Sequence, residues 1–565
     1  MSKYCTTSQT KFLSIILLLV FTIACKESKK NLKTVNDIIL WTPYNDSVEV
    51  AANLEHENER MHYKLIQSKV LDKNDVFRPL YNEMSSFSEE RYVALKPLVL
   101  EQNINTIQSH ITNDKFSYEE LVLFYLKRIY KYELDNATTL NTVIALNPNV
   151  LKEARNLDKN KEGHHPIYGM PILLKDNIGT QDMKTTAGAL ALQNNQTDDA
   201  FIVNRLKENG ALILGKVNLS EWAYFLCRGC PLGYSAYGGQ TLNPYGRRVF
   251  ETGGSSSGSG TSIAANYAVA AVGTETSGSI LSPSSQNSIV GLKPTIGLLS
   301  RTGIVPISST LDTPGPMTRN VVDNAILLSA MLGHDSVDKA SVTEHYTGIL
   351  TAGLHPEPIK NLRLGAFKDL MESDSIYRET VIKLKNAGAV IVEFTPPEVN
   401  MDGFLSILNI DMKNDLPSYI KTQVKDKNAV KIRSINDAVT YNNQDSLVRI
   451  PYGQALFEGI LVDSTTVEGL KEIKERLEKN SRTYFDISMD KHNLNAILSI
   501  NNYHAGFAAV AKYPALTIPM GYKANGEPIS LTFIGKQFSE ADLLRIGKTY
   551  EDLTRMRKGP EGYEE

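Results

Sequence analysis

Residues 253–283 read GGSSSGSGTSIAANYAVAAVGTETSGSILSP, and this stretch decides how the whole chain is interpreted. A glycine and serine loop (253–260) leads into an apolar run of small residues, which predicts a helix over 261–272, and then into a second hydroxyl-rich loop (273–279). Glycine lets a backbone turn sharply and approach a ligand closely, and a helix starting after such a loop points unpaired N–H groups at it. A flexible linker would not lead directly into a buried apolar segment. We therefore interpret the two loops as parts of one functional site.

A second informative stretch, residues 165–179, reads HPIYGMPILLKDNIG. Its apolar run 171–174 predicts a buried strand that ends on Lys175. A lysine is costly to bury, so the ordinary interpretation is a strand-end lysine that reaches solvent. The alternative is a lysine that is held inside a site.

Together these motifs resemble those of the amidase signature family. The resemblance covers residues 103–556 and rests on GMPILLKDN, GGSSSGSG, GTETSGSILSPSS, GLKPTIGLLSRTGIVPIS, LDTPGPM, YPALTIPMGY and PISLTFIGKQFSEADLLRI. Several motifs in the right order are harder to obtain by chance than one short pattern. The resemblance, closest to peptide amidase-like members, implies an α/β fold with a large mixed β-sheet flanked by helices on both faces. It also implies an amidase, a hydrolase of linear carboxamides that forms an acyl-enzyme and releases ammonia or an amine, without a cofactor or metal.

The resemblance further assigns roles to three residues of this chain. Lys175 matches the base, Ser255 the bridging serine beside a cis peptide bond, and Ser279 the nucleophile of a Ser–cis-Ser–Lys triad. The two serines are 24 positions apart, as they are in the family. These matches imply that the lysine is buried and that the two loops meet around it.

The residue types suit amide hydrolysis. A serine hydroxyl is a weak nucleophile until a neighbour takes its proton, and burial favours the neutral lysine that could take it. Ser255 would relay this proton and later return it to the leaving nitrogen. In the family the oxyanion is held by backbone N–H groups of the second loop, which correspond here to Thr276, Ser277, Gly278 and Ser279.

Two other interpretations remain open at this point. Residues 254–258 satisfy the pattern G-x-S-x-G with Ser256 as nucleophile, as in an α/β-hydrolase esterase or lipase, which would also need an acid and a histidine such as His492 or His504. The other alternative is an exported lipoprotein that binds a ligand without converting it, although a pure binder needs neither a nucleophile nor a base. We expect three further serines of the loop to make structural hydrogen bonds within it: Ser256, Ser257 and Ser259.

The first 25 residues predict export. Lys3 and Lys11 precede the apolar run 12–24, FLSIILLLVFTIA, which is short for a membrane span. Cys25 follows, as in a bacterial lipoprotein signal whose cysteine becomes lipidated. We therefore expect a signal peptide and a lipoprotein anchored to a membrane, facing the periplasm or the cell surface, with an ordinary signal peptide or an anchor helix as the alternative. An exported chain would not meet charged transfer RNA, which favours hydrolysis over transamidation.

Length and composition fit one large domain with an appendage. The 565 residues carry a net charge of −3, which provides no basic field for nucleic acid. We expect a signal over 1–25, a tether and accessory helical segment over 26–102 with a helix over 57–71, and the amidase signature domain over 103–556. Cys227 and Cys230 form either a disulfide or two free thiols. The substrate beyond a small amide or peptide amide, and the oligomeric state, stay open.

Overall fold

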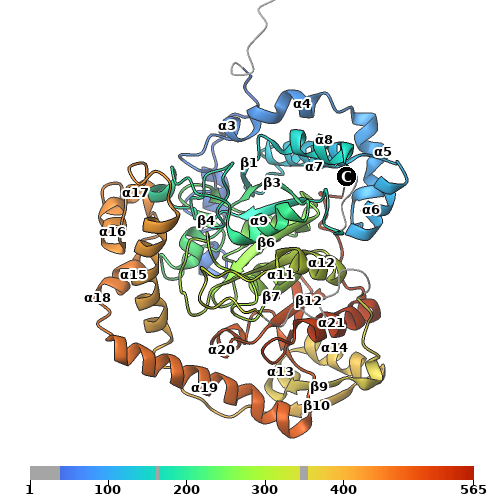
Figure 1. Cartoon of the computed structure of the whole chain (residues 1–565), viewed down its shortest axis with the longest axis vertical. Helices are drawn as coiled ribbons and strands as arrows, with labels where there is room; N and C mark the ends of the chain where they lie inside the picture. The colour runs from blue at the N-terminus through green and yellow to red at the C-terminus, as the bar shows by residue number, and fades with distance from the viewer. Residues whose placement is uncertain (1–37, 161–164, 344–353, 565) are drawn as a thin grey trace, which may run out of the picture. The chain divides into compact units, whose positions relative to one another are not determined.

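A large mixed β-sheet lies at the centre of the chain (Figure 1). The computed structural model describes residues 38–160, 165–343 and 354–564, and residues from Leu40 onward form one compact unit. Eleven strands of this described part form the sheet, in the order β1 (Val143–Leu146), β3 (Leu212–Val217), β2 (Pro171–Lys175), β6 (Ala270–Glu275), β8 (Thr313–Thr318), β7 (Val290–Lys293), β12 (Ala515–Tyr522), β13 (Pro528–Ile534), β11 (Ala496–Ile500), β9 (Arg363–Phe367) and β10 (Val390–Phe394).

The strand that carries Lys175 lies inside this sheet. β2 pairs in parallel with β3 on one side and with β6 on the other. All five of its residues are buried, as expected for a strand that is covered on both faces. The predicted strand over 171–174 is therefore confirmed, and its last residue faces the interior of the fold.

Helices cover both faces of the sheet, as the resemblance implied. On β12 the side chains alternate: Leu516 and Ile518 point toward helix α21 (Glu540–Thr554), while Thr517 bonds Ser285 of α11 (Leu281–Gln286). The other α-helices of the described part are α2 (Ser47–Ala52), α3 (Lys73–Phe77), α4 (Tyr81–Ser85), α5 (Glu89–Val99), α6 (Ile104–Thr112), α7 (Tyr118–Glu133), α8 (Val150–Lys159), α9 (Phe201–Glu208), α10 (Ser257–Ala264), α12 (Val321–Met331), α13 (Lys368–Ser373), α14 (Ser375–Asn386), α15 (Phe404–Gln423), α16 (Ile435–Asn443), α17 (Ser446–Arg449), α18 (Ala455–Val462), α19 (Val467–His492) and α20 (Ala505–Val510).

The helix predicted over 261–272 is wrong in its extent. Helix α10 begins within the serine loop and ends at Ala264, and the chain continues as strand β6 from Ala270. Asn266 adopts a left-handed backbone conformation (φ 57°), which ends the helix. The apolar run 268–272 is buried in the sheet, between β2 and β8. A buried strand of small residues and a buried helix have the same composition, so the sequence alone does not distinguish them.

Helices α15, α16, α18 and α19 pack around a second hydrophobic cluster, beside the loop that contains Trp222. Helix α19 is the long orange helix at the lower edge of Figure 1. It contains the charged stretch VEGLKEIKERLEKNSRTYF, whose apolar residues recur at helical spacing. This layer of helices forms part of the walls of the cavities described below.

The helix predicted over 57–71 is also wrong. Only a single 3₁₀ turn, η2 (Glu59–Met61), forms there. Met61, Tyr63 and Ile66 are buried in the main core, and the backbone of Ile66 bonds distant loops. Tertiary contacts along an extended path therefore outweigh the helical spacing of the apolar residues.

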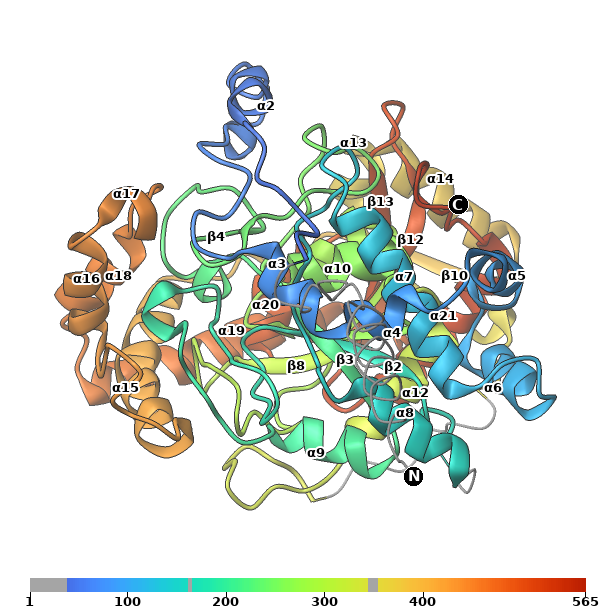
Figure 2. The ribbon, with the colours of Figure 1, turned by 90° about the horizontal axis from the view of Figure 1, so that it is seen from above.

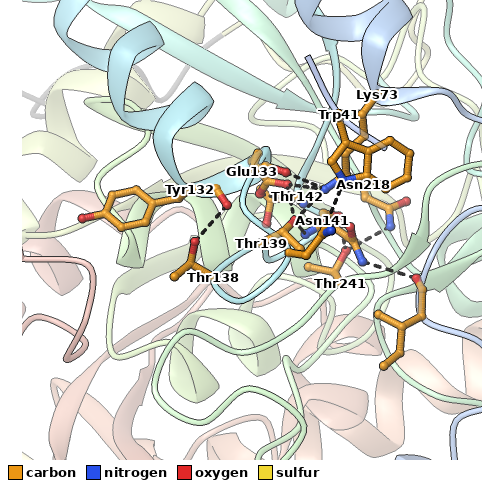
Figure 3. A network of polar contacts seen from close by, with 12 residues as sticks. Trp41, Lys73, Tyr132, Glu133, Thr138, Thr139, Asn141, Thr142, Asn218 and Thr241 are labelled. Atoms are coloured by element: carbon orange, nitrogen blue, oxygen red, sulfur yellow. Dashed lines mark hydrogen bonds and ion pairs between the residues drawn. The ribbon is translucent and has the colours of Figure 1, made fainter. Parts of the chain in front are cut away.

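A buried polar network fastens the chain before residue 80 to the main domain (Figure 3). Lys73 Nζ donates to Thr139 Oγ1 (2.6 Å) and to the carbonyl of Glu133 (2.7 Å), and lies 3.5 Å from the Glu133 carboxylate. The carboxylate also accepts from Thr139 Oγ1 (3.0 Å) and from the N–H of Thr142 (3.1 Å). Thr142 Oγ1 in turn lies 2.8 Å from Thr261 Oγ1 in α10, so the network reaches the serine loop.

We expect Lys73→Met to lower the free energy of unfolding by about 3 kcal/mol, because it leaves the buried Glu133 carboxylate without its cation. The matched control is Lys127→Met, which removes a partly exposed ion pair to Glu89 and a hydrogen bond to the carbonyl of Phe87, and is expected to cost about 1 kcal/mol. Urea unfolding of both variants measures the difference. Equal losses would show that the Lys73–Glu133 pair does not hold the segment.

Candidate active site

Lys175 ends β2 inside the protein, with no exposed surface. Its Nζ donates to Ser255 Oγ (2.8 Å), to Thr274 Oγ1 (2.8 Å) and to the carbonyl of Thr274 (3.0 Å). Thr274 belongs to the neighbouring strand β6, and its hydroxyl also accepts from Asn177 Nδ2 (2.9 Å). Three acceptors therefore fix the ammonium group, and one of them is the serine that the motifs singled out.

Burial lowers the pKa of Lys175 to about 7, although the carboxylates of Asp312 and Glu275 oppose this shift. A lysine that titrates near neutral pH is present in substantial part as the free amine. The site thus holds an uncharged nitrogen base next to a serine hydroxyl, which is the arrangement that general-base chemistry needs.

The serine loop approaches the lysine through backbone that other residues could not form. Gly253 has a left-handed conformation (φ 64°), and a Cβ atom there would lie 2.7 Å from Pro283. The peptide bond between Gly254 and Ser255 is cis, as the resemblance implied. These features place Ser255 beneath the loop with its side chain fully buried against Lys175.

Ser279 lies on the second loop, which is joined directly to the first. The N–H of Ser256 donates to the carbonyl of Ser279 (3.1 Å). Ser279 is 9% exposed and lines a cavity of about 440 Å³. Lys175 is therefore hydrogen-bonded to Ser255 on the first loop. The backbone bond between Ser256 and Ser279 holds the second loop beside the first, with Ser279 at the wall of the cavity.

The backbone of the second loop is ordered by Glu275. Its carboxylate accepts from the N–H groups of Gly278 (2.7 Å), Ile280 (2.7 Å) and Leu281 (3.0 Å). Gly278, which we expected among the oxyanion donors, therefore has its N–H directed at Glu275 in this structure. Sequence reasoning missed Glu275; the signal was a carboxylate between apolar and small residues, which must find N–H partners when it is buried.

The other serines of the first loop are structural, as expected. Ser256 Oγ donates to the carbonyl of Thr274 (3.0 Å) and accepts from its N–H (3.2 Å). Ser257 Oγ donates to the carbonyl of Gly253 (2.6 Å), and Ser259 Oγ to that of Val272 (3.1 Å). All three side chains are buried.

The nucleophile-elbow interpretation with Ser256 is not supported. His504 lies 2.6 Å from Ser499 Oγ and stacks on Phe367, and His492 ends helix α19. Burial lowers the pKa of His504 to about 4. With its hydroxyl bonded on both sides to Thr274, Ser256 instead holds the loop on β6.

The cavity next to Ser279 has apolar walls and a polar end. Its apolar lining includes Phe225, Leu232, Phe404 and Leu408. Its polar lining includes Arg60, Glu251, Gln286, Asn501, Asn502, Tyr503 and Lys523.

Cys227 and Cys230, whose state the sequence left open, form a disulfide in the loop that follows Phe225.

A second cavity of about 320 Å³ is also lined by the loop that follows β6, through Thr276. Asn177, Thr274 and Asp312 are among its lining residues. It shares with the first cavity the residues Ala223, Thr276 and Ile307. Thr276 is held there by Asp312, whose carboxylate accepts from the threonine hydroxyl (2.5 Å).

Comparison with known proteins agrees with this fold. The sequence profile of the family described as Amidase matches residues 120–450. A protein from Arabidopsis thaliana named "Probable amidase" is 35% identical over 488 residues, which cover 82% of this chain and 92% of the relative. Among solved structures, an amidase family protein from Bacillus anthracis has a TM-score of 0.82 at 36% identity and covers 88% of this chain and 100% of its own. Native peptide amidase from Stenotrophomonas maltophilia has a TM-score of 0.76 at 35% identity and covers 82% and 99%.

The α/β sheet and the similarity to these amidases define an amide-hydrolysing enzyme. The chain belongs to the amidase family.

The predicted export and lipid anchoring are contradicted by the relatives. Those that align with four fifths of this chain come from Arabidopsis thaliana, Schizosaccharomyces pombe and bacteria, and one of them is a glutamyl-tRNA(Gln) amidotransferase component from Halothermothrix orenii. The name of this relative refers to transfer RNA, and such a relative disagrees with the prediction of an exported lipoprotein. Cys25 and the predicted signal lie outside the described residues. Across 38–160, 165–343 and 354–564, no helix has the length and apolar character needed to cross a membrane.

Proposed function

We propose that the protein hydrolyses the terminal carboxamide of peptide amides, with Ser279 as nucleophile, Ser255 as proton relay and Lys175 as base. The observation that carries this proposal is the 2.8 Å hydrogen bond from Lys175 Nζ to Ser255 Oγ, beside the cavity that Ser279 lines. The lowered pKa of Lys175 supports the role of base.

The proposed reaction begins when Ser279 Oγ attacks the carbonyl carbon of the amide. Its proton passes to Ser255 Oγ, while the Ser255 proton moves to the neutral amine of Lys175. The tetrahedral intermediate collapses as this proton returns through Ser255 to the leaving nitrogen, so that ammonia departs and an acyl ester on Ser279 remains. A water molecule then repeats the sequence, giving the carboxylic acid and free Ser279.

The oxyanion of each intermediate needs N–H donors close to Ser279. Because the N–H of Gly278 donates to Glu275, we assign this role to the N–H groups of Thr276, Ser277 and Ser279. Glu275 would act indirectly, since its contacts with Gly278 and Ile280 fix the turn that presents these donors.

Two observations support peptide amides as the substrate class. The similar solved structures include a peptide amidase, over 82% of this chain. The cavity of about 440 Å³ is also much larger than a small aliphatic amide, which at about 30 Å³ per water-sized group occupies on the order of 150 Å³. The similarity to a peptide amidase is also the ground on which we propose hydrolysis and not transamidation.

Ammonia release from peptide amides, aryl amides and aliphatic amides by the purified full chain tests the proposal. We expect kcat/KM to be highest for the peptide amides, because they fill the cavity. The same peptides with a free terminal carboxylate serve as controls for ammonia from other sources. Ammonia release from none of the three amide classes would contradict the proposed function.

A further inference from the structure

Arg60 reaches the catalytic cavity from outside the part of the chain that matches the family profile. The profile begins at residue 120, whereas Arg60 belongs to η2, in the segment over residues 53–68. We call this stretch the N-terminal segment. Arg60 is nevertheless one of the lining residues of the cavity that holds Ser279.

The N-terminal segment is held in place at several points. Asn53 Nδ2 donates to the carbonyl of Arg248 (3.0 Å), and the N–H of Lys64 donates to the hydroxyl of Tyr452 (2.7 Å). The carbonyl of Ile66 accepts from the N–H of Gln240 (2.8 Å) and from Asn141 Nδ2 (3.3 Å), and Asn141 is part of the network of Figure 3. The position of Arg60 at the cavity is therefore built into the fold. Figure 2 shows the chain around α2 (Ser47–Ala52), just before this segment, in blue.

The Arg60 guanidinium is oriented by Glu251. Its Nε lies 2.8 Å from Glu251 Oε1, and its Nη2 donates to Glu251 Oε2 (2.9 Å). Of the five N–H donors of arginine, only one on Nη2 is hydrogen-bonded to Glu251, while the Nε contact is an ion pair. The Glu251 side chain is 14% exposed and that of Arg60 is 43% exposed. The carboxylate is therefore the more buried partner of the pair, and the guanidinium is the more accessible one.

Gln286 brings a second polar side chain to the same cavity. Gln286, at the end of α11, lines it, and its buried Oε1 has no hydrogen-bond partner within the described part of the chain. A buried acceptor without a donor is costly, and an N–H group of a bound peptide could relieve that cost after a small rotation of the Gln286 side chain. Donors from Arg60 and an acceptor from Gln286 match the C=O and N–H groups of a peptide main chain.

We propose that Arg60 is a substrate-binding residue that, with Gln286, binds the main chain of the acyl part of a peptide amide and so selects peptide amides over simple amides. This inference rests on the proposed function. In this arrangement the N-terminal segment completes the substrate site, and the guanidinium donates to a carbonyl of the residue before the terminal amide.

The variant Arg60→Gln tests this inference against a matched control, Arg248→Gln. Arg248 also joins the N-terminal part of the chain to the loop over 246–251, through an ion pair with Glu49 (3.3 Å), but it does not line the cavity. The measurement is kcat/KM for an acetylated dipeptide amide divided by kcat/KM for propionamide. We expect Arg60→Gln to lower this ratio by about tenfold, mainly through KM, because a charge-assisted hydrogen bond is lost. Arg248→Gln is expected to change it less than about twofold.

Equal changes in the two variants, or an unchanged ratio in Arg60→Gln, would overturn the inference. Melting temperatures of both proteins show whether they fold. If Arg60→Gln does not fold, Arg60→Lys replaces it, and we expect an intermediate loss because lysine keeps the charge without the planar fork. If the wild-type enzyme releases ammonia from propionamide but from no peptide amide, the proposed substrate class is wrong; if it hydrolyses the dipeptide amide and the ratio survives Arg60→Gln, only the role of Arg60 is wrong.

Discussion

Ser279→Ala is expected to abolish ammonia release, with kcat falling by roughly 10⁴-fold or more, because no oxygen remains to form the acyl-enzyme. The fold should be nearly unchanged, since Ser279 contributes its backbone carbonyl, and not its side chain, to the bond with Ser256. Ammonia assays and mass spectrometry after treatment with a fluorophosphonate measure the effect: wild type gains one adduct at Ser279, and the variant gains none.

Ser256→Ala is the control for this experiment. Because Ser256 Oγ bonds the backbone of Thr274 on both sides, this variant should lose stability yet retain the adduct and most of its rate. Labelling of Ser256 in the Ser279→Ala variant, together with preserved hydrolysis, would show that the assignment of the nucleophile is wrong.

Lys175→Met should lower kcat by about 10²- to 10⁴-fold, the usual contribution of a general base. In the wild-type enzyme the neutral amine is the active form, so the rate should rise as pH increases through about 7, the lowered pKa of Lys175, and fall as pH drops below it. The pH dependence of kcat/KM in the free enzyme measures this pKa. The small residual rate of the variant should lack the rise near pH 7.

A second buried lysine provides the control. Burial lowers the pKa of Lys293 on β7 to about 8, and its Nζ donates to the carbonyl of Pro294 (3.1 Å). Lys293→Met removes this titrating group without touching Ser255, and the rise near pH 7 should persist. If that rise disappears in Lys293→Met and persists in Lys175→Met, the base has been assigned to the wrong residue.

The motifs were sufficient to predict the family, the sheet and the contact between Lys175 and Ser255, because several specific patterns occur in the chain in the order that the family has. The helix predicted over 261–272 failed because a small-residue apolar run does not distinguish a buried helix from a central strand. Only the left-handed conformation of Asn266 and the place between β2 and β8 decide it. Glu275 could have been suspected, but its three N–H partners exist only after the loop has folded around it.

The N-terminal segment could not be predicted, for a different reason. Its apolar residues have helical spacing, yet its side chains and backbone form hydrogen bonds with residues up to several hundred positions away in the sequence. One example is the bond from the N–H of Lys64 to the hydroxyl of Tyr452. Arg60 lies in a run of charged residues that is ordinary for an exposed face. Nothing local distinguishes it from its neighbours, because its place at the cavity depends on Glu251 and on the contacts that hold the segment.

The predicted division of the chain into parts, with boundaries at residues 25, 102 and 556, stays a prediction.

The wall shared by the two cavities affects how the enzyme can evolve. Ala223, Thr276 and Ile307 line both spaces, and only Thr276 belongs to the loop of the proposed nucleophile. Ala223 has a left-handed backbone conformation, as do its neighbours Trp222 and Tyr224. The position of Ala223 in the wall is therefore determined by the backbone of this turn. Ile307 is the one large aliphatic side chain in this partition. We expect Ile307→Ala to enlarge the space at this wall while leaving the lysine and both serines untouched, and therefore to shift kcat/KM toward amides with longer acyl groups.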